Sequence, residues 1–145
     1  MTYSFPHSPA ADPETIAWLK RELLPTVSKR MTDRGAPIFP YGNFNRDHTV
    51  WESYGFEPRY STEYMGLRGK IGILVESYSY ATYQRRIEVS YAFMEECIDG
   101  LARRSKEVAK LVRRQVTEPP RGVSIQGKVE SQGERAQVEI GRAHV

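Results

Sequence analysis

The segment at residues 70–77, KIGILVES, constrains the fold of this chain more than any other stretch. Alternate residues of a β-strand point to opposite faces. One face of this segment carries Ile71, Ile73 and Val75, and the other stays apolar until Glu76. A strand that is apolar on both faces is typical of an α/β sheet, in which both faces are covered. We therefore expect an α/β fold with this strand buried inside it.

Glu76 is the strongest candidate for chemistry, because it places a carboxylate at the end of an apolar strand. In open α/β sheets, ligands bind beyond the carboxyl ends of the strands. Desolvation at such a position would raise the pKa of the carboxyl group, which suits a general base. The alternative is a structural ion pair with one of the nearby arginines, which are Arg59, Arg68 and Arg85.

A first helix is predicted to begin at residues 12–14, where an Asp cap is followed by Pro and Glu. Its apolar face has a spacing of three and four residues and comprises Ile16, Leu19 and Leu23. Pro25 removes a backbone hydrogen bond, so we expect a kink or a break after Leu24. Gly35 is a predicted C-cap.

A second helix is predicted from about residue 81 to residue 115. Its apolar face recurs at spacings of four and three residues and comprises Ile87, Tyr91, Met94, Ile98 and Leu101. Gly100 indicates a bend or a junction, and Cys97 is expected to be a small buried apolar residue. Residues 102–115 carry six basic side chains and one acidic one. This charge favours either a binding surface for anions or, as we prefer, a solvated helix end whose cations suit the helix dipole.

Between the two helices, residues 35–62 combine turn-forming residues with interleaved aromatic residues. The aromatic residues are Tyr41, Phe44, Trp51, Tyr54, Phe56 and Tyr60. Long loops of this kind are usually functional loops or lids, and the alternative is that the rings anchor the loop to the body of the protein.

Composition excludes several classes of protein. No apolar run approaches the roughly 18 residues that a membrane span needs. The single cysteine excludes an internal disulfide framework, and the net charge of +3 does not by itself imply a nucleic-acid partner. None of the three histidines belongs to a paired metal-ligand motif, so no metal ligand is assigned within the chain. The first residues have no basic and apolar pattern of a signal peptide.

The stretch from Pro58 to Tyr80, PRYSTEYMGLRGKIGILVESYSY, resembles the last catalytic part of bacterial zinc carboxypeptidases of the carboxypeptidase A-like family. Members of this kind carry a YxGLRNRIxILxEtYSY pattern that is followed by a long helix, and this chain has Gly69 where the pattern has Asn. The opening residues 2–13 are similar to the segment that follows the third zinc ligand. The resemblance covers roughly residues 1–115.

The resemblance implies a mixed β-sheet with flanking helices and the hydrolysis of C-terminal peptide bonds by a zinc-activated water. Glu76 matches the glutamate that acts as general base and then as acid. Tyr54 best fits the mobile tyrosine that contacts the substrate, with Tyr60 and Tyr64 as alternatives. The zinc ligands and the arginines that bind the substrate are expected before residue 1, so the parent binds zinc and this chain alone binds none.

These observations divide the chain into three parts. Residues 1–116 are expected to be the C-terminal portion of a carboxypeptidase-like catalytic domain, and residues 117–138 a linker or the start of a β module. Residues 139–145, EIGRAHV, resemble the translation of a sequencing adapter, so we expect them to be an artefact. The expected partner is a peptide or protein C-terminus, not nucleic acid or a membrane, and the compartment of the parent stays open. The alternative function is a non-enzymatic α/β or helical binding module with a basic helix surface.

Overall fold

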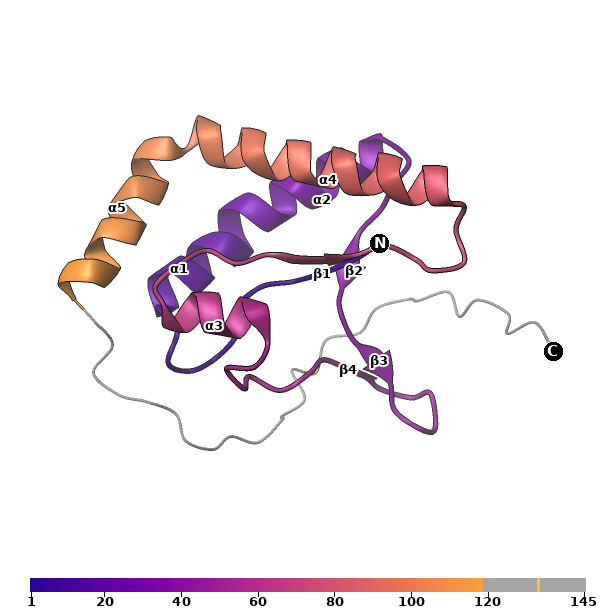
Figure 1. Cartoon of the computed structure of the whole chain (residues 1–145), viewed down its shortest axis with the longest axis horizontal. Coiled ribbons are helices and arrows are strands. Elements are labelled where there is room, and N and C mark those ends of the chain that lie inside the picture. Colours follow the sequence, from indigo (N-terminus) through magenta and orange to yellow (C-terminus); the bar gives the residue numbers. More distant parts are fainter. Residues whose placement is uncertain (119–132, 134–145) are drawn as a thin grey trace.

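Three short strands form a mixed sheet beside the helices (Figure 1). The structure is a computed structural model that describes residues 1–118 and residue 133. The middle strand β1 (Thr2–Ser4) pairs in parallel with β2 (Phe39–Pro40) and antiparallel with β5 (Leu74–Glu76). A separate antiparallel hairpin consists of β3 (Asn43–Phe44) and β4 (Trp51–Glu52). Helices together with a small mixed sheet confirm the general α/β class.

The predicted strand at residues 70–77 is shorter and less buried than expected. Only Leu74–Glu76 pair as a strand. The expected division of faces holds, because Ile71, Ile73 and Val75 pack against the hydrophobic core. Burial on both sides was wrong, since β5 is an edge strand of the described sheet and its three residues are half-buried or exposed.

The first helical region begins as predicted. The Asp12 carboxylate accepts a hydrogen bond from the Thr15 backbone N–H at 2.8 Å, and Pro13 occupies the first turn of α1 (Pro13–Trp18). The helix then continues through a π-helical turn, η1 (Leu19–Leu23), into α2 (Leu24–Asp33).

Pro25 does not break this helix, so of the expected kink or break the break is wrong. The π-helical turn η1 immediately precedes it, and the Leu24 backbone N–H donates to the Leu19 carbonyl, five residues back. A proline in a helix removes one N–H and its ring collides with the carbonyl four residues back. One wider turn accommodates both effects, so the apolar face remains continuous.

Gly35 ends α2 as predicted. Its φ is +67°, a left-handed conformation that glycine adopts without strain. Its N–H donates to the Thr32 carbonyl and the Ala36 N–H donates to the Met31 carbonyl, each at 2.9 Å. This pair of hydrogen bonds is a Schellman motif, which satisfies the last carbonyls of the helix.

The second helical region consists of two helices, α4 (Tyr83–Arg103) and α5 (Ser105–Thr117), which meet at Arg104 (Figure 1). The bend or junction expected at Gly100 therefore lies at Arg104 instead. Gly100 is buried inside α4, where an added Cβ would lie 2.6 Å from Leu23 Cδ1. Glycine at this position lets α4 approach η1 closely.

The predicted apolar face of α4 is exposed, which is a second correction. Only Leu101 of that set packs at the core. Ile87, Tyr91, Met94 and Ile98 are 51–66% exposed. The buried face instead comprises Phe93, Glu96, Cys97 and Gly100. It packs on a core formed by Trp18, Leu19, Leu23, Leu24, Val27, Met31, Ala36 and Ile38.

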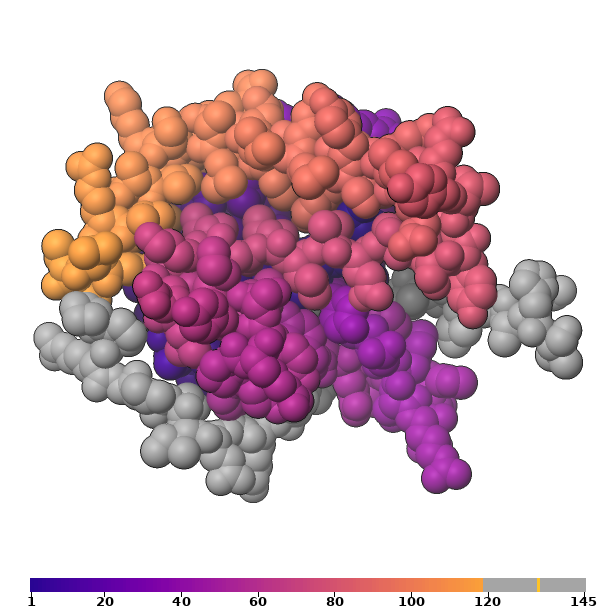
Figure 2. All heavy atoms as spheres, in the orientation of Figure 1, coloured from indigo at the N-terminus to yellow at the C-terminus, as the bar shows by residue number. Residues whose placement is uncertain are grey.

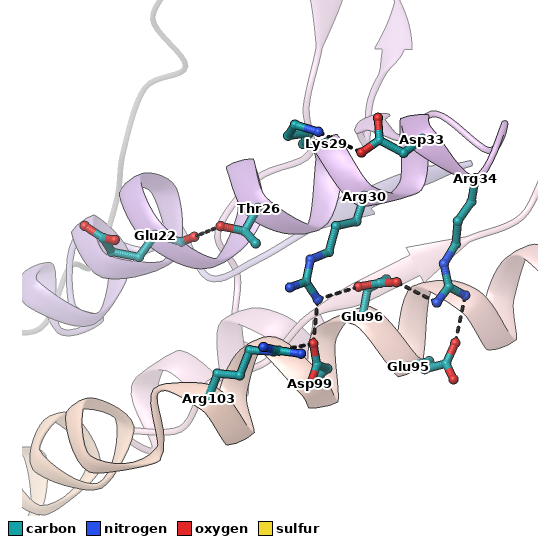
Figure 3. Close-up of polar contacts among 10 residues, drawn as sticks. All are labelled: Glu22, Thr26, Lys29, Arg30, Asp33, Arg34, Glu95, Glu96, Asp99 and Arg103. Atoms are coloured by element: carbon teal, nitrogen blue, oxygen red, sulfur yellow. Dashed lines mark hydrogen bonds and ion pairs between the residues drawn. The ribbon is translucent and has the colours of Figure 1, made fainter.

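Ion pairs join the C-terminal end of α2 to the middle of α4 (Figure 3). Arg30 binds Glu96 at 3.0 Å and Asp99 at 2.5 Å, and Arg34 binds Glu95 and Glu96 at 2.7 Å. Glu96 is buried, so its carboxylate requires these partners. The contacts fix the register between the two helices.

No described helix has the length and apolar character that a membrane crossing requires. The predicted β module at residues 117–138 and the expected artefact at residues 139–145 lie outside the described residues, apart from Thr117, Glu118 and Gly133.

Candidate functional site

An open cleft of about 400 Å³ lies on the face of the sheet opposite the core. It is bounded by the aromatic loop, by the start of α3 (Ser61–Leu67) and by β5. Its lining residues are Tyr41, Asn43, Phe44, Glu52, Ser53, Tyr54, Tyr60, Ser61, Thr62 and Leu74. The cleft therefore combines aromatic rings with hydroxyl groups and one exposed carboxylate, that of Glu52.

Tyr54 is held in the wall of this cleft by its hydroxyl group. The hydroxyl donates to Ser4 Oγ at 2.9 Å and lies 2.7 Å from Thr62 Oγ1. Ser4 stands opposite Leu74 in the β1–β5 ladder, so the tyrosine hydroxyl contacts the cleft face of the sheet. The loop, the sheet and α3 thus meet at one side chain.

Aromatic contacts support Tyr54 from several sides. Its ring makes edge contacts with Tyr60, His7 and Tyr41, at centroid distances of 4.7, 5.1 and 5.5 Å. Of the two alternatives for the substrate tyrosine, Tyr60 lines the cleft, whereas Tyr64 is half-exposed and is not among the lining residues. The structure brings Tyr54 and Tyr60 together and leaves Tyr64 apart.

Glu76 lies on the cleft face of β5. Leu74 lines the cleft, and a residue two positions further along a strand points to the same face. The side chain is exposed, so the desolvation expected from the sequence is absent among the described residues. The alternative ion pair is also absent there: Arg59 binds Glu57, Arg85 binds the Gly35 carbonyl and Glu88, and Arg68 forms no ion pair with another described residue. The Glu76 carboxylate is open to solvent beside the cleft.

His7 and Glu63 form a buried polar pair behind the cleft that the sequence did not reveal. Glu63 is fully buried and accepts hydrogen bonds from the backbone N–H groups of His7 and Ser8. Its Oε1 lies 2.8 Å from His7 Nδ1, and this contact raises the pKa of His7 above its ordinary value. His7 Nε2 lies 3.0 Å from the Tyr54 carbonyl oxygen, so the pair supports the aromatic loop.

Within the described part of the chain, no group of three or more His, Cys, Asp or Glu side chains could hold a metal ion. The His7–Glu63 pair supplies two such groups, and both are already engaged in hydrogen bonds. The described residues therefore do not fit a zinc site.

Three of the six basic side chains at residues 103–114, which span the end of α4 and most of α5, form ion pairs within the chain. Arg103 binds Asp99, Arg104 binds Glu22, and Arg114 binds both Asp12 and Glu14. The other three basic side chains, Lys106, Lys110 and Arg113, make no ion pair with another described residue and line a shallow hollow along α5. About half of the positive charge at residues 103–114 is therefore used in ion pairs within the chain.

Comparison with known proteins identified no relative. No protein-family model, no curated protein and no solved structure matches the chain.

Proposed function

We propose that this chain supplies the general base and one wall of the substrate cleft of a zinc metallocarboxypeptidase, an enzyme that hydrolyses C-terminal peptide bonds. The observation that carries the proposal is the position of Glu76. An exposed carboxylate stands at the end of β5, on the same face of the sheet as the aromatic cleft. The stretch that resembles the family, Pro58 to Tyr80, contains Glu76 and also contributes Tyr60, Ser61, Thr62 and Leu74 to the cleft.

In this proposal Glu76 moves a proton between two partners. Its carboxylate accepts a proton from the water whose oxygen attacks the carbonyl carbon of the last peptide bond. It then gives that proton to the nitrogen of the leaving amino acid as the C–N bond breaks. Solvent exposure gives water access to the carboxylate, and the nearby cleft is a place for the end of the peptide.

Tyr54 and Tyr60 are the proposed substrate contacts. Their rings offer an apolar surface, and the hydroxyl of Tyr54 can exchange its bonds to Ser4 and Thr62 for one to the substrate. Because the described residues offer no zinc site, the proposal assigns the zinc ligands to sequence outside them.

The alternative function, a binding module with a basic helix surface, has less support. Three of the six basic side chains at residues 103–114 are engaged in ion pairs within the chain. A surface that binds a polyanion mainly through charge would leave those cations free.

The test is a comparison of variants in the full-length enzyme that contains this segment. Glu76→Gln should lower kcat for release of a C-terminal amino acid by about 10²–10⁴-fold with little change in KM, since general-base catalysis contributes that much. Glu88→Gln, an exposed glutamate on α4, is the matched control and should leave kcat unchanged. Retention of full activity by Glu76→Gln contradicts the proposal.

The 145-residue chain offers an independent test. Purified alone, it should contain no zinc and release no amino acid from peptides. Zinc at about one equivalent per chain would contradict the placement of the ligands outside it.

A further inference from the structure

The wall of the cleft carries a carboxylate, that of Glu52, which the proposed reaction does not use. Among the described residues that line the cleft, Glu52 is the single charged one. Its side chain is exposed and makes no hydrogen bond or ion pair with another described residue. A carboxylate that is free in this way can bind a cationic group of a ligand by charge-assisted hydrogen bonds.

The β3–β4 hairpin holds Glu52 on the cleft side. Glu52 stands opposite Asn43 in the ladder, and both residues line the cleft. The neighbouring Trp51 is not among the lining residues, as expected because successive residues of a strand point to opposite faces. The space-filling view shows the hairpin projecting from the body on the side away from α4 (Figure 2). Two hydrogen-bond acceptors, a carboxylate and an amide oxygen, therefore occupy neighbouring positions of one wall.

The other walls of the cleft are rich in aromatic rings, namely those of Tyr41, Phe44, Tyr54 and Tyr60. Lysine and arginine side chains lay their apolar stems along such surfaces, and their charged ends are attracted to the faces of aromatic rings. The ring of Tyr60 already makes one contact of this kind, because Arg59 Cζ lies 4.9 Å from its centroid. The cleft volume of about 400 Å³ falls in the range of sites for small ligands, so a single long side chain has room.

The described charges around the cleft are net negative. The two cations nearby are already paired, since Arg59 Nη2 lies 3.4 Å from Glu57 Oε1 and His7 Nδ1 lies 2.8 Å from Glu63 Oε1. Glu76 adds a second carboxylate beside the cleft. A site of this sign attracts a cation and repels an acidic group. A terminal carboxylate finds no cation among the described lining residues, so the cleft suits the side chain of a substrate and not its terminal carboxylate.

We propose that the cleft selects lysine or arginine as the last residue of the substrate, and that Glu52 recognises the positive charge of that side chain. The inference rests on the proposed function, in which Glu76 acts at the peptide bond before that residue. The alkyl stem of the substrate side chain lies along the tyrosine rings. Its ammonium or guanidinium group donates hydrogen bonds to the Glu52 carboxylate and the Asn43 amide oxygen.

The first experiment measures binding to the 145-residue chain by NMR titration and needs no catalytic activity. The probes are the methylamides of Nα-acetylarginine and Nα-acetylcitrulline, which differ in charge but little in shape. The arginine probe should bind at least about threefold more tightly, the size of effect that one exposed ion pair gives. Glu52→Gln should bring this ratio close to one. Asp47→Asn is the matched control, because it removes one exposed negative charge from the turn of the same hairpin outside the cleft and should keep the ratio.

A change of charge sign separates recognition from loss of structure. Glu52→Lys should reverse the preference, so that the citrulline probe binds more tightly than the arginine probe, a result that unfolding cannot produce. Circular dichroism should show the same helix content in all variants. Equal binding of the two probes to the wild type, or a ratio that Glu52→Gln leaves unchanged, overturns the proposal.

The second experiment measures kcat/KM in the full-length enzyme that contains this segment, with peptides that end in arginine or in citrulline. The arginine peptide should be preferred at least about threefold, and Glu52→Gln should remove the preference. A preference for arginine at the second-last position, and not at the last, overturns the assignment. The two proposals fail separately. Full activity of Glu76→Gln contradicts the catalytic proposal alone, whereas equal binding of the two probes beside an inactive Glu76→Gln variant contradicts the role of Glu52 alone.

Discussion

The Nδ1 atom of His7 lies 2.8 Å from Oε1 of Glu63, a carboxylate that is fully buried. The same carboxylate accepts the backbone N–H groups of His7 and Ser8 at 3.1 and 2.8 Å. The segment after β1 is thereby bound to α3, and the two elements form one support for the cleft. A buried carboxylate with these donors is strongly coupled to the fold, because loss of a partner leaves it unsatisfied.

The first prediction concerns His7→Gln and its dependence on pH. The contact with Glu63 raises the pKa of His7 in the folded state above the unfolded value of 6.5. The stabilisation is therefore complete below about pH 6.5 and is lost as the pH rises through the folded value. Urea unfolding should show His7→Gln destabilised by about 1–2 kcal/mol near pH 5.5 and less at higher pH, as for a hydrogen bond to a charged group.

Gln84→Ala on the exposed side of α4 is a control for this measurement, because it removes no titratable group. Its difference from the wild type should stay constant with pH. A His7→Gln difference that is flat, or that grows as the pH rises, would show that the pair does not stabilise the fold through the charged imidazole.

The second prediction is that Gly100→Ala destabilises the fold although alanine favours helices. The helix propensity gain is about 1 kcal/mol. The new Cβ would lie 2.6 Å from Leu23 Cδ1, and Leu23 is only 1% exposed. Overpacking of this kind costs about 1–3 kcal/mol, so the net effect should be a loss of roughly 1 kcal/mol in chemical denaturation.

A double variant identifies the cause. Leu23→Ala alone should cost about 2–5 kcal/mol. The double variant Leu23→Ala, Gly100→Ala should lose less free energy of unfolding than the sum of the two single losses. The difference should be at least about 0.5 kcal/mol, because the alanine Cβ at position 100 then fills space that Leu23 has vacated. Additive costs would refute the contact between these two residues.

The buried face of α4 shows why periodicity predicted the helix but not its orientation. Both sides of α4 carry residues at helical spacing, and the larger side chains, such as Tyr91 and Ile98, lie outside. The smaller ones, Cys97 and Gly100, face the core because close approach to η1 requires little volume there. Side-chain size alone therefore predicts the wrong buried face of α4.

The candidate site was predictable only in part. The alternation along residues 71–76 correctly divided the strand into two faces, since Ile73 and Val75 pack in the core and Leu74 lines the cleft, but it did not show which face would be open. The exposure of the Glu76 side chain was not predictable, because it depends on which strands flank β5. Glu63 was missed because a glutamate in a polar segment shows no sign of burial until its N–H donors, 55 and 56 residues away, are known.

The third prediction concerns the reactivity of Cys97. Burial, together with the nearby Glu96, raises the pKa of its thiol to about 11 from an ordinary 9.0. At pH 8 the thiolate fraction should therefore be about 100-fold lower than for a free thiol. Reaction with a disulfide reagent should be at least that much slower in the folded chain than in urea. Equal rates in the two states would show that Cys97 is accessible and not part of the core.

The last prediction is that Tyr54→Phe weakens the fold through the two hydroxyl groups it leaves behind. Ser4 and Thr62 are 7% and 2% exposed, and both bond to the Tyr54 hydroxyl. Their loss of a partner should lower the free energy of unfolding by about 1–3 kcal/mol, while the ring contacts remain. Tyr60→Phe is the matched control, because the Tyr60 hydroxyl bonds to Arg59 in an exposed setting and its loss should cost less than about 0.5 kcal/mol. Urea unfolding of both variants gives the comparison. If the two variants lose the same free energy of unfolding, the hydroxyl of Tyr54 does not join the loop to the sheet and α3.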